Sequence, residues 1–70
     1  MDMQKRLKAT LRNIEARGYT LREEWLEGSG GGCEIRGKKF FFSDLSLPLP
    51  DRLQQALDFW EELSNTSEKP

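Results

Sequence analysis

The chain lacks histidine and has one cysteine, Cys33, among its 70 residues. Without histidine it has neither the commonest general base nor the commonest metal ligand, and no Ser-His or Cys-His pair can form. One cysteine cannot close an intrachain disulfide, and without histidine it cannot complete a structural zinc site. We therefore expect a protein that is not an enzyme, holds no cofactor or metal, and works in the reducing cytoplasm.

Long hydrophobic runs are also absent. No stretch approaches the roughly 18 apolar residues of a membrane-spanning helix, and no apolar signal-peptide core follows the basic N-terminal segment. A chain of this length builds one domain with a small core, to which a partner can add stability. We expect one soluble, untargeted domain over residues 1–64 and a disordered tail over residues 65–70.

Two segments have the apolar spacing of amphipathic helices. The first is followed by Gly18, which suits the left-handed residue after a helix, and the second has Pro50 in its first turn and runs to about Leu63. The apolar stripes consist of Met3, Leu7, Leu11 and Ile14 in the first helix, and of Leu53, Ala56, Leu57, Trp60 and Leu63 in the second.

Strands are predicted between these helices. Residues 19–25 alternate in polarity, residues 28–32 are a glycine-rich flexible connector, and residues 33–43 form a hairpin that turns at Gly37 and Lys38. Counting outward from this turn, Cys33, Ile35, Phe40 and Phe42 share one face of the hairpin. The other face carries Glu34, Arg36, Lys39 and Phe41.

The order of elements predicts an α+β fold with the sequence α-β-β-β-α. The simplest arrangement is a three-stranded antiparallel sheet with two helices packed on one face. Both helical stripes would then form the core with apolar residues of the sheet, namely Leu21, Trp25, Ile35, Phe40 and Phe42.

This arrangement leaves one face of the sheet open and places Phe41 on it. An open face with a phenylalanine, in a domain with a small core, is typical of a protein-interaction module or a homodimer. We therefore predict a self-associating module or accessory subunit, with no small-molecule substrate. Its predicted contact residues are Phe41, Glu34, Arg36, Lys39 and Leu26.

Two alternatives start from other residues. Residues 1–22 hold six basic and two acidic residues, and Lys5, Lys8 and Arg12 lie near one side of the first helix, where they could bind nucleic acid or another acidic partner. Cys33 could act as a nucleophile or redox group. The predicted pairing instead buries it beside Phe42 as a small hydrophobic residue.

The spacing GxxxxGK of a phosphate-binding loop occurs from Gly32 to Lys38. A working loop needs Ser or Thr next and a helix after it, so that backbone amides and the helix N-terminus face the phosphates. Here Lys39 takes the hydroxyl position and three phenylalanines follow as a strand. This motif is therefore interpreted as a hairpin.

The run GGGCEIRGKKFFFSDLSLPLPDRLQQAL resembles short bacterial proteins of unknown function that share a glycine-cysteine segment, a GK hairpin, a hydrophobic strand and a leucine-rich helix. A similar hairpin precedes the metal-binding helix of some small bacterial zinc-peptidase domains. The HExxH motif of those domains is replaced here by DRLQQALDFW. The resemblance thus implies shared fold fragments and a bacterial origin, without catalysis.

Overall fold

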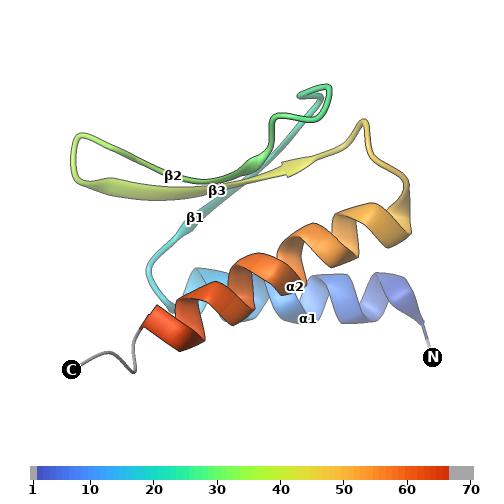
Figure 1. Ribbon diagram of the computed structural model, residues 1–70, viewed down its shortest axis with the longest axis horizontal. Helices are drawn as coiled ribbons and strands as arrows, with labels where there is room; N and C mark the ends of the chain where they lie inside the picture. Colours follow the sequence, from blue (N-terminus) through green and yellow to red (C-terminus); the bar gives the residue numbers. More distant parts are fainter. Residues whose placement is uncertain (1, 67–70) are drawn as a thin grey trace.

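The computed structural model describes residues 2–66 and has the predicted α+β class and order of elements (Figure 1). The elements are α1 (Met3–Ala16), β1 (Thr20–Glu24), β2 (Gly31–Ile35), β3 (Lys38–Asp44) and α2 (Leu49–Thr66). The three strands form one layer, and both helices lie side by side against one face of it.

The sheet is mixed, so the prediction of a wholly antiparallel sheet is wrong. The strand order is β1-β3-β2, with β1 parallel to β3 and β2 antiparallel to β3. The phenylalanine-rich strand β3 takes the centre, where it has a neighbour on each side. Residues 25–30 cross from one edge of the sheet to the other before β2 begins, and β1 and β3 therefore run the same way.

Helix α1 forms as its pattern predicts. Asp2 caps its start by accepting a hydrogen bond from the backbone N–H of Gln4 (2.9 Å), and Gly18 follows its end with φ of 97°. Three residues of its stripe are buried: Leu7, Leu11 and Ile14. Met3 remains 42% exposed at the first turn.

Helix α2 is longer than predicted at its C-terminal end. It begins at Leu49 with Pro50 in its first turn, and it continues beyond Leu63 to Thr66. The predicted disordered tail is therefore wrong for Asn65 and Thr66, which are helical, and the rest of that tail lies outside the described residues. Leu53 and Ala56 are buried, while Leu57 and Trp60 pack against the core and are partly buried.

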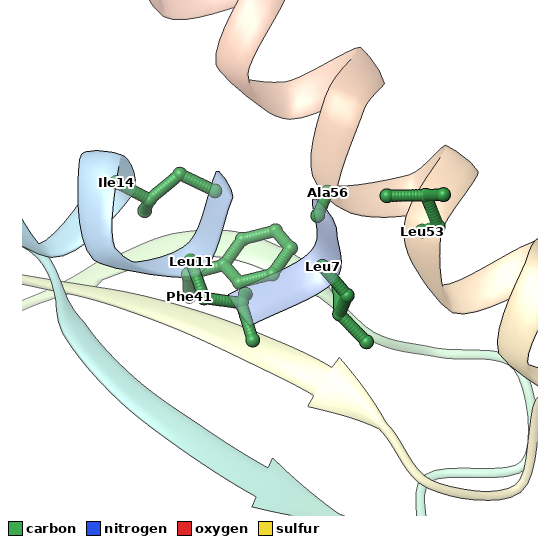
Figure 2. Packing of buried hydrophobic residues seen from close by; sticks show 6 residues of the cluster. All are labelled: Leu7, Leu11, Ile14, Phe41, Leu53 and Ala56. Atoms are coloured by element: carbon green, nitrogen blue, oxygen red, sulfur yellow. The ribbon is translucent and has the colours of Figure 1, made fainter. Parts of the chain in front are cut away.

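The core lies between the sheet and the two helices. Its buried hydrophobic residues are Leu7, Leu11, Ile14, Phe41, Leu53 and Ala56 (Figure 2). Near the ends of the helices, the guanidinium of Arg17 lies 5.6 Å from the centroid of the Trp60 ring, a cation–π contact that joins α1 to α2.

The faces of the sheet are reversed relative to the prediction. Phe41 is fully buried and its ring points toward the helices (Figure 2), whereas Phe40 and Phe42 lie on the opposite face and do not pack against the core. Two other residues predicted for the core, Trp25 and Ile35, are 74% and 50% exposed. Of the sheet residues predicted for the core, Leu21 is the one that packs there.

Glycine explains why Phe41 faces the helices. Gly32 of β2 is the neighbour of Phe41, and a Cβ atom at Gly32 would overlap the Phe59 ring of α2. Because this position has no side chain, Phe59 lies directly over the strand and stacks on Phe41, with ring centroids 4.9 Å apart. Gly32 is thus a packing position, and the prediction of a flexible connector is wrong for Gly31 and Gly32, which are part of β2.

The hairpin is confirmed, but it turns one residue earlier than predicted. Its two turn residues are Arg36 and Gly37, with φ of 52° and 83°, and Ile35 pairs with Lys38. Positive φ at both positions is the signature of a type I′ turn. The shift by one residue keeps Cys33, Ile35, Phe40 and Phe42 on a common face, as predicted.

Candidate protein-association surface

One face of the sheet is not covered by either helix (Figure 1). Side chains alternate along each strand, so the register assigns ten residues to this side of the sheet; Asp44 is fully buried, and the other nine form the open face. This open face consists of Thr20, Arg22 and Glu24 on β1, Lys38, Phe40 and Phe42 on β3, and Gly31, Cys33 and Ile35 on β2.

Apolar groups occupy the middle of the open face and its β2 side. The rings of Phe40 and Phe42 stack with centroids 5.9 Å apart, and both residues are partly exposed. Cys33 and Ile35 are exposed beside them. The prediction that Cys33 is buried is wrong, because its face is the open one and its strand is at the edge of the sheet.

The charged side chains of the open face are Arg22 and Glu24 on β1 and Lys38 beside the hairpin turn. Arg22 and Glu24 form an ion pair, with a distance of 2.8 Å between Nη2 and Oε2. An exposed pair of this kind stabilises the fold by about 1 kcal/mol at most. Apart from Lys38, the apolar part of the face lies toward β2 and the charged part toward β1.

A hollow of about 270 Å³ lies where β2 begins, lined by Leu26, Cys33, Phe42 and the segment from residue 29 to residue 32. Gly31 contributes no side chain, and a Cβ atom built on it would meet nothing within 4 Å. The hollow is therefore an opening in the apolar part of the face, large enough for an aliphatic side chain.

Asp44 fixes the loop that forms one wall of this hollow. It is fully buried at the end of β3, and its carboxylate accepts hydrogen bonds from the backbone N–H groups of Leu26, Gly28 and Ser46 and from the Ser46 hydroxyl. The bond from Leu26 measures 3.0 Å and that from the Ser46 hydroxyl 2.7 Å. One side chain thus holds the loop after β1 against the turn after β3.

Burial alone raises the pKa of Asp44, but the hydrogen bonds from Ser46, Leu26 and Gly28 lower it by more. The pKa of Asp44 in the folded protein therefore lies well below that of an ordinary aspartate. Since the folded pKa is lowered, the charged carboxylate stabilises the fold above about pH 4, and this contribution is lost as the pH falls toward the folded pKa.

We expect Asp44→Asn to reduce the free energy of unfolding at neutral pH, because the amide cannot accept all the hydrogen bonds that the carboxylate accepts. The difference between wild type and variant should shrink as the pH falls below about 4. Urea unfolding of both proteins at a series of pH values measures it. A difference that is constant with pH would contradict this role.

The structure separates the residues predicted for the interaction surface. Phe41 is in the core and Arg36 is in the turn. Glu34 and Lys39 are cross-strand neighbours on the helix side of the hairpin. Leu26 does line the hollow at the open face. The predicted surface is thus wrong in its central residue, because the prediction assigned the face with more apolar residues to the core.

The basic residues of the alternative site are exposed along α1. Lys8 and Arg12 border a hollow that is also lined by two carboxylates, Glu15 and Glu23. These carboxylates offset the positive potential that a nucleic-acid backbone would need. The geometry therefore does not single out this helix face over the open face of the sheet.

Some functional residues escaped the sequence analysis. The sequence analysis predicts no role for Asp44, although an aspartate two residues before Ser46 has the spacing of an Asx turn. Gly30 was treated as linker, yet a Cβ atom there would lie 2.7 Å from the carbonyl oxygen of Phe42. Nothing local in the sequence signals this second contact, because it depends on how the loop folds over β3.

Within residues 2–66, no helix is long and apolar enough to cross a membrane, and no three His, Cys, Asp or Glu side chains are grouped so that they could hold a metal ion. Comparisons with protein-family models, curated proteins and solved structures found no match to this chain. The function must therefore be argued from the surface itself.

Proposed function

We propose that the protein is a non-enzymatic protein-association module that binds a second copy of itself through the β2 side of its open sheet face. The observation that carries this proposal is the stacked pair Phe40 and Phe42, which lies next to the exposed residues Cys33 and Ile35 and outside the core. Clustered apolar side chains on a surface are typical of protein interfaces.

The size of the core supports a partner. Six hydrophobic residues are buried within residues 2–66, and a single core in a chain of this length rarely supplies more than about 3–5 kcal/mol of stability. Association adds to this stability, because any partner that binds only the folded state shifts the folding equilibrium. A small domain therefore becomes more stable when a partner covers its remaining apolar surface.

The distribution of charge supports a second copy as the partner. The chain has a net charge of −1, and Arg22 and Glu24 largely neutralise each other on the open face. Two identical molecules therefore meet with little electrostatic repulsion. The single cysteine is also compatible with association in the reducing cytoplasm, where no interchain disulfide is needed.

Substitution of one exposed residue tests the proposal. We expect Ile35→Ser to raise the dimer dissociation constant roughly tenfold or more, because each copy loses one buried aliphatic side chain. Met3→Ser is the matched control, since Met3 is 42% and Ile35 is 50% exposed but Met3 lies on α1, away from the open face. Sedimentation velocity over a concentration series measures the dimer dissociation constant of each variant.

An unchanged dissociation constant for Ile35→Ser would contradict the proposal. Equal weakening by both substitutions would also contradict it, because association would then not depend on this face. Thermal unfolding of each variant by circular dichroism verifies that the fold is retained.

A further inference from the structure

The two edges of the sheet differ in their protection against strand pairing. The β1 edge carries Arg22, Glu23 and Glu24, and charged side chains are a common means by which proteins keep edge strands unpaired. The β2 edge, Gly31–Ile35, has one charged residue and no proline, and every residue after Gly31 is exposed. Its outward backbone N–H and C=O groups are therefore available to another strand.

The sequence of β2 is complementary to itself. Its first two residues are glycines and its last two are Glu34 and Ile35, with Cys33 in the middle. When two copies pair antiparallel about Cys33, Ile35 of each lies opposite Gly31 of the other, and Glu34 lies opposite Gly32. Each large side chain thus meets a position without one, as a two-fold symmetric interface requires.

In this pairing, Ile35 of one copy lies next to the hollow at the start of β2 of the other copy. Residues directly opposite each other in an antiparallel pair point to the same face, so Ile35 and the opposing Gly31 are both on the open face. The hollow of about 270 Å³ beside Gly31 is bordered by Leu26 and Phe42. It would receive the Ile35 side chain, which is half exposed in the single chain.

Electrostatics permit this arrangement. The two Glu34 side chains would be diagonal neighbours on the helix side, which by itself costs some stability. Each Glu34 is the cross-strand neighbour of Lys39 of its own β3, whose ammonium lies 5.7 Å from the centroid of the Tyr19 ring, and a cation on this side of the sheet reduces the repulsion. On this side Phe59 lies over Gly32, so the opposing Glu34 side chain would lie beside that ring.

We propose that two copies join through antiparallel pairing of their β2 strands about Cys33, forming a continuous six-stranded sheet. This inference rests on the proposed self-association and specifies its geometry. Both helix layers then lie on one side of the sheet, and the two open faces form one continuous surface on the other. The Phe40 and Phe42 pairs of the two copies lie on that common surface, where each Phe42 borders the hollow that receives Ile35 of the other copy.

Cross-linking through the natural cysteine tests this geometry. Directly opposite residues of an antiparallel pair have Cα atoms about 4.5–5.5 Å apart, within the range of disulfides, so oxidised glutathione should bridge Cys33 to the Cys33 of a second copy. One S–S bond forms between the two Sγ atoms. Oxidised glutathione takes the two electrons and two protons and is released as two molecules of reduced glutathione.

The control is the double variant Cys33→Ser with Lys38→Cys, which moves the thiol to another exposed position of the open face. In the proposed dimer, two residues 38 are separated by three strand spacings, about 14 Å, and by a further offset along the strands, so they are too far apart for a disulfide. We expect wild type to form the covalent dimer roughly tenfold faster or more, because strand pairing raises the local thiol concentration.

The outcomes separate this inference from the proposed function. Equal or slower bridging of wild type, together with a dimer of the reduced protein in sedimentation, overturns the β2 pairing and leaves self-association standing. A reduced protein that is monomeric at all concentrations overturns both. Selective bridging through Cys33 with a reduced dimer supports both.

Discussion

Phe41→Ala should be the most destabilising of the single substitutions whose cost we estimate. Phe41 is fully buried, packs between the helices and stacks on Phe59, and truncation of a buried phenylalanine costs about 3–5 kcal/mol. A single core in a chain of this length rarely supplies more than about 3–5 kcal/mol of stability. The variant should therefore lose much or all of its cooperative unfolding transition, as measured by urea denaturation followed by circular dichroism.

The neighbouring phenylalanine provides the matched control. Phe40 is on the open face and partly exposed, so Phe40→Ala should cost about 1 kcal/mol. The order of the two effects decides which face of β3 meets the helices. A larger loss from Phe40→Ala than from Phe41→Ala would contradict the assignment of faces described above.

Gly32→Ala should destabilise the fold by about 1–3 kcal/mol, the usual cost of overpacking a close contact. This sign is opposite to expectation for most strands, where replacing glycine by alanine is stabilising by roughly 0.5–1 kcal/mol. The reason is that the new methyl group would overlap the Phe59 ring. Equilibrium urea unfolding of the variant measures the effect.

A double-mutant cycle isolates this contact. In a Phe59→Ala background the ring is absent, so the cost of Gly32→Ala should fall toward zero or become a gain. The same cost in both backgrounds would show that Gly32 is required for a reason other than close approach of α2 to β2.

The helices and the hairpin could be predicted because their signals are local. The stripe containing Leu7, Leu11 and Ile14 has the helical period, and Gly18 supplies the positive φ at the end of α1. Gly37 likewise predicts a tight turn, but it could occupy either position of a two-residue turn, at residues 36–37 or at residues 37–38. The structure selects the turn in which Arg36 also has positive φ.

The orientation of the sheet could not be predicted in this way, because it depends on contacts between distant residues. The alternation of side chains along β3 correctly places Phe40 and Phe42 on one face and Phe41 on the other. It does not predict which of these two faces meets the helices. That choice is associated with the fit of Phe59 over Gly32, a contact between residues 27 positions apart that composition does not reveal.

The candidate site was incompletely predicted for the same reason. An open sheet face was expected and Leu26 does border it, but its central residues are Phe40 and Phe42 in place of Phe41. The burial of the Asp44 carboxylate and the close contact of Gly30 depend on how the loop over residues 25–30 folds against β3, which no local pattern predicts. Prediction of the surface requires the sheet order, which places β2 at an edge.

The most direct test of self-association is sedimentation equilibrium of the wild-type protein over a wide concentration range, at low and high salt. The proposed contacts are apolar groups and backbone hydrogen bonds, which salt screens little, so we expect a dimer with a similar dissociation constant at both salt concentrations. A monomer throughout would contradict the proposal. A dimer lost at high salt would also contradict it, since association would then depend on charged surfaces such as that of α1.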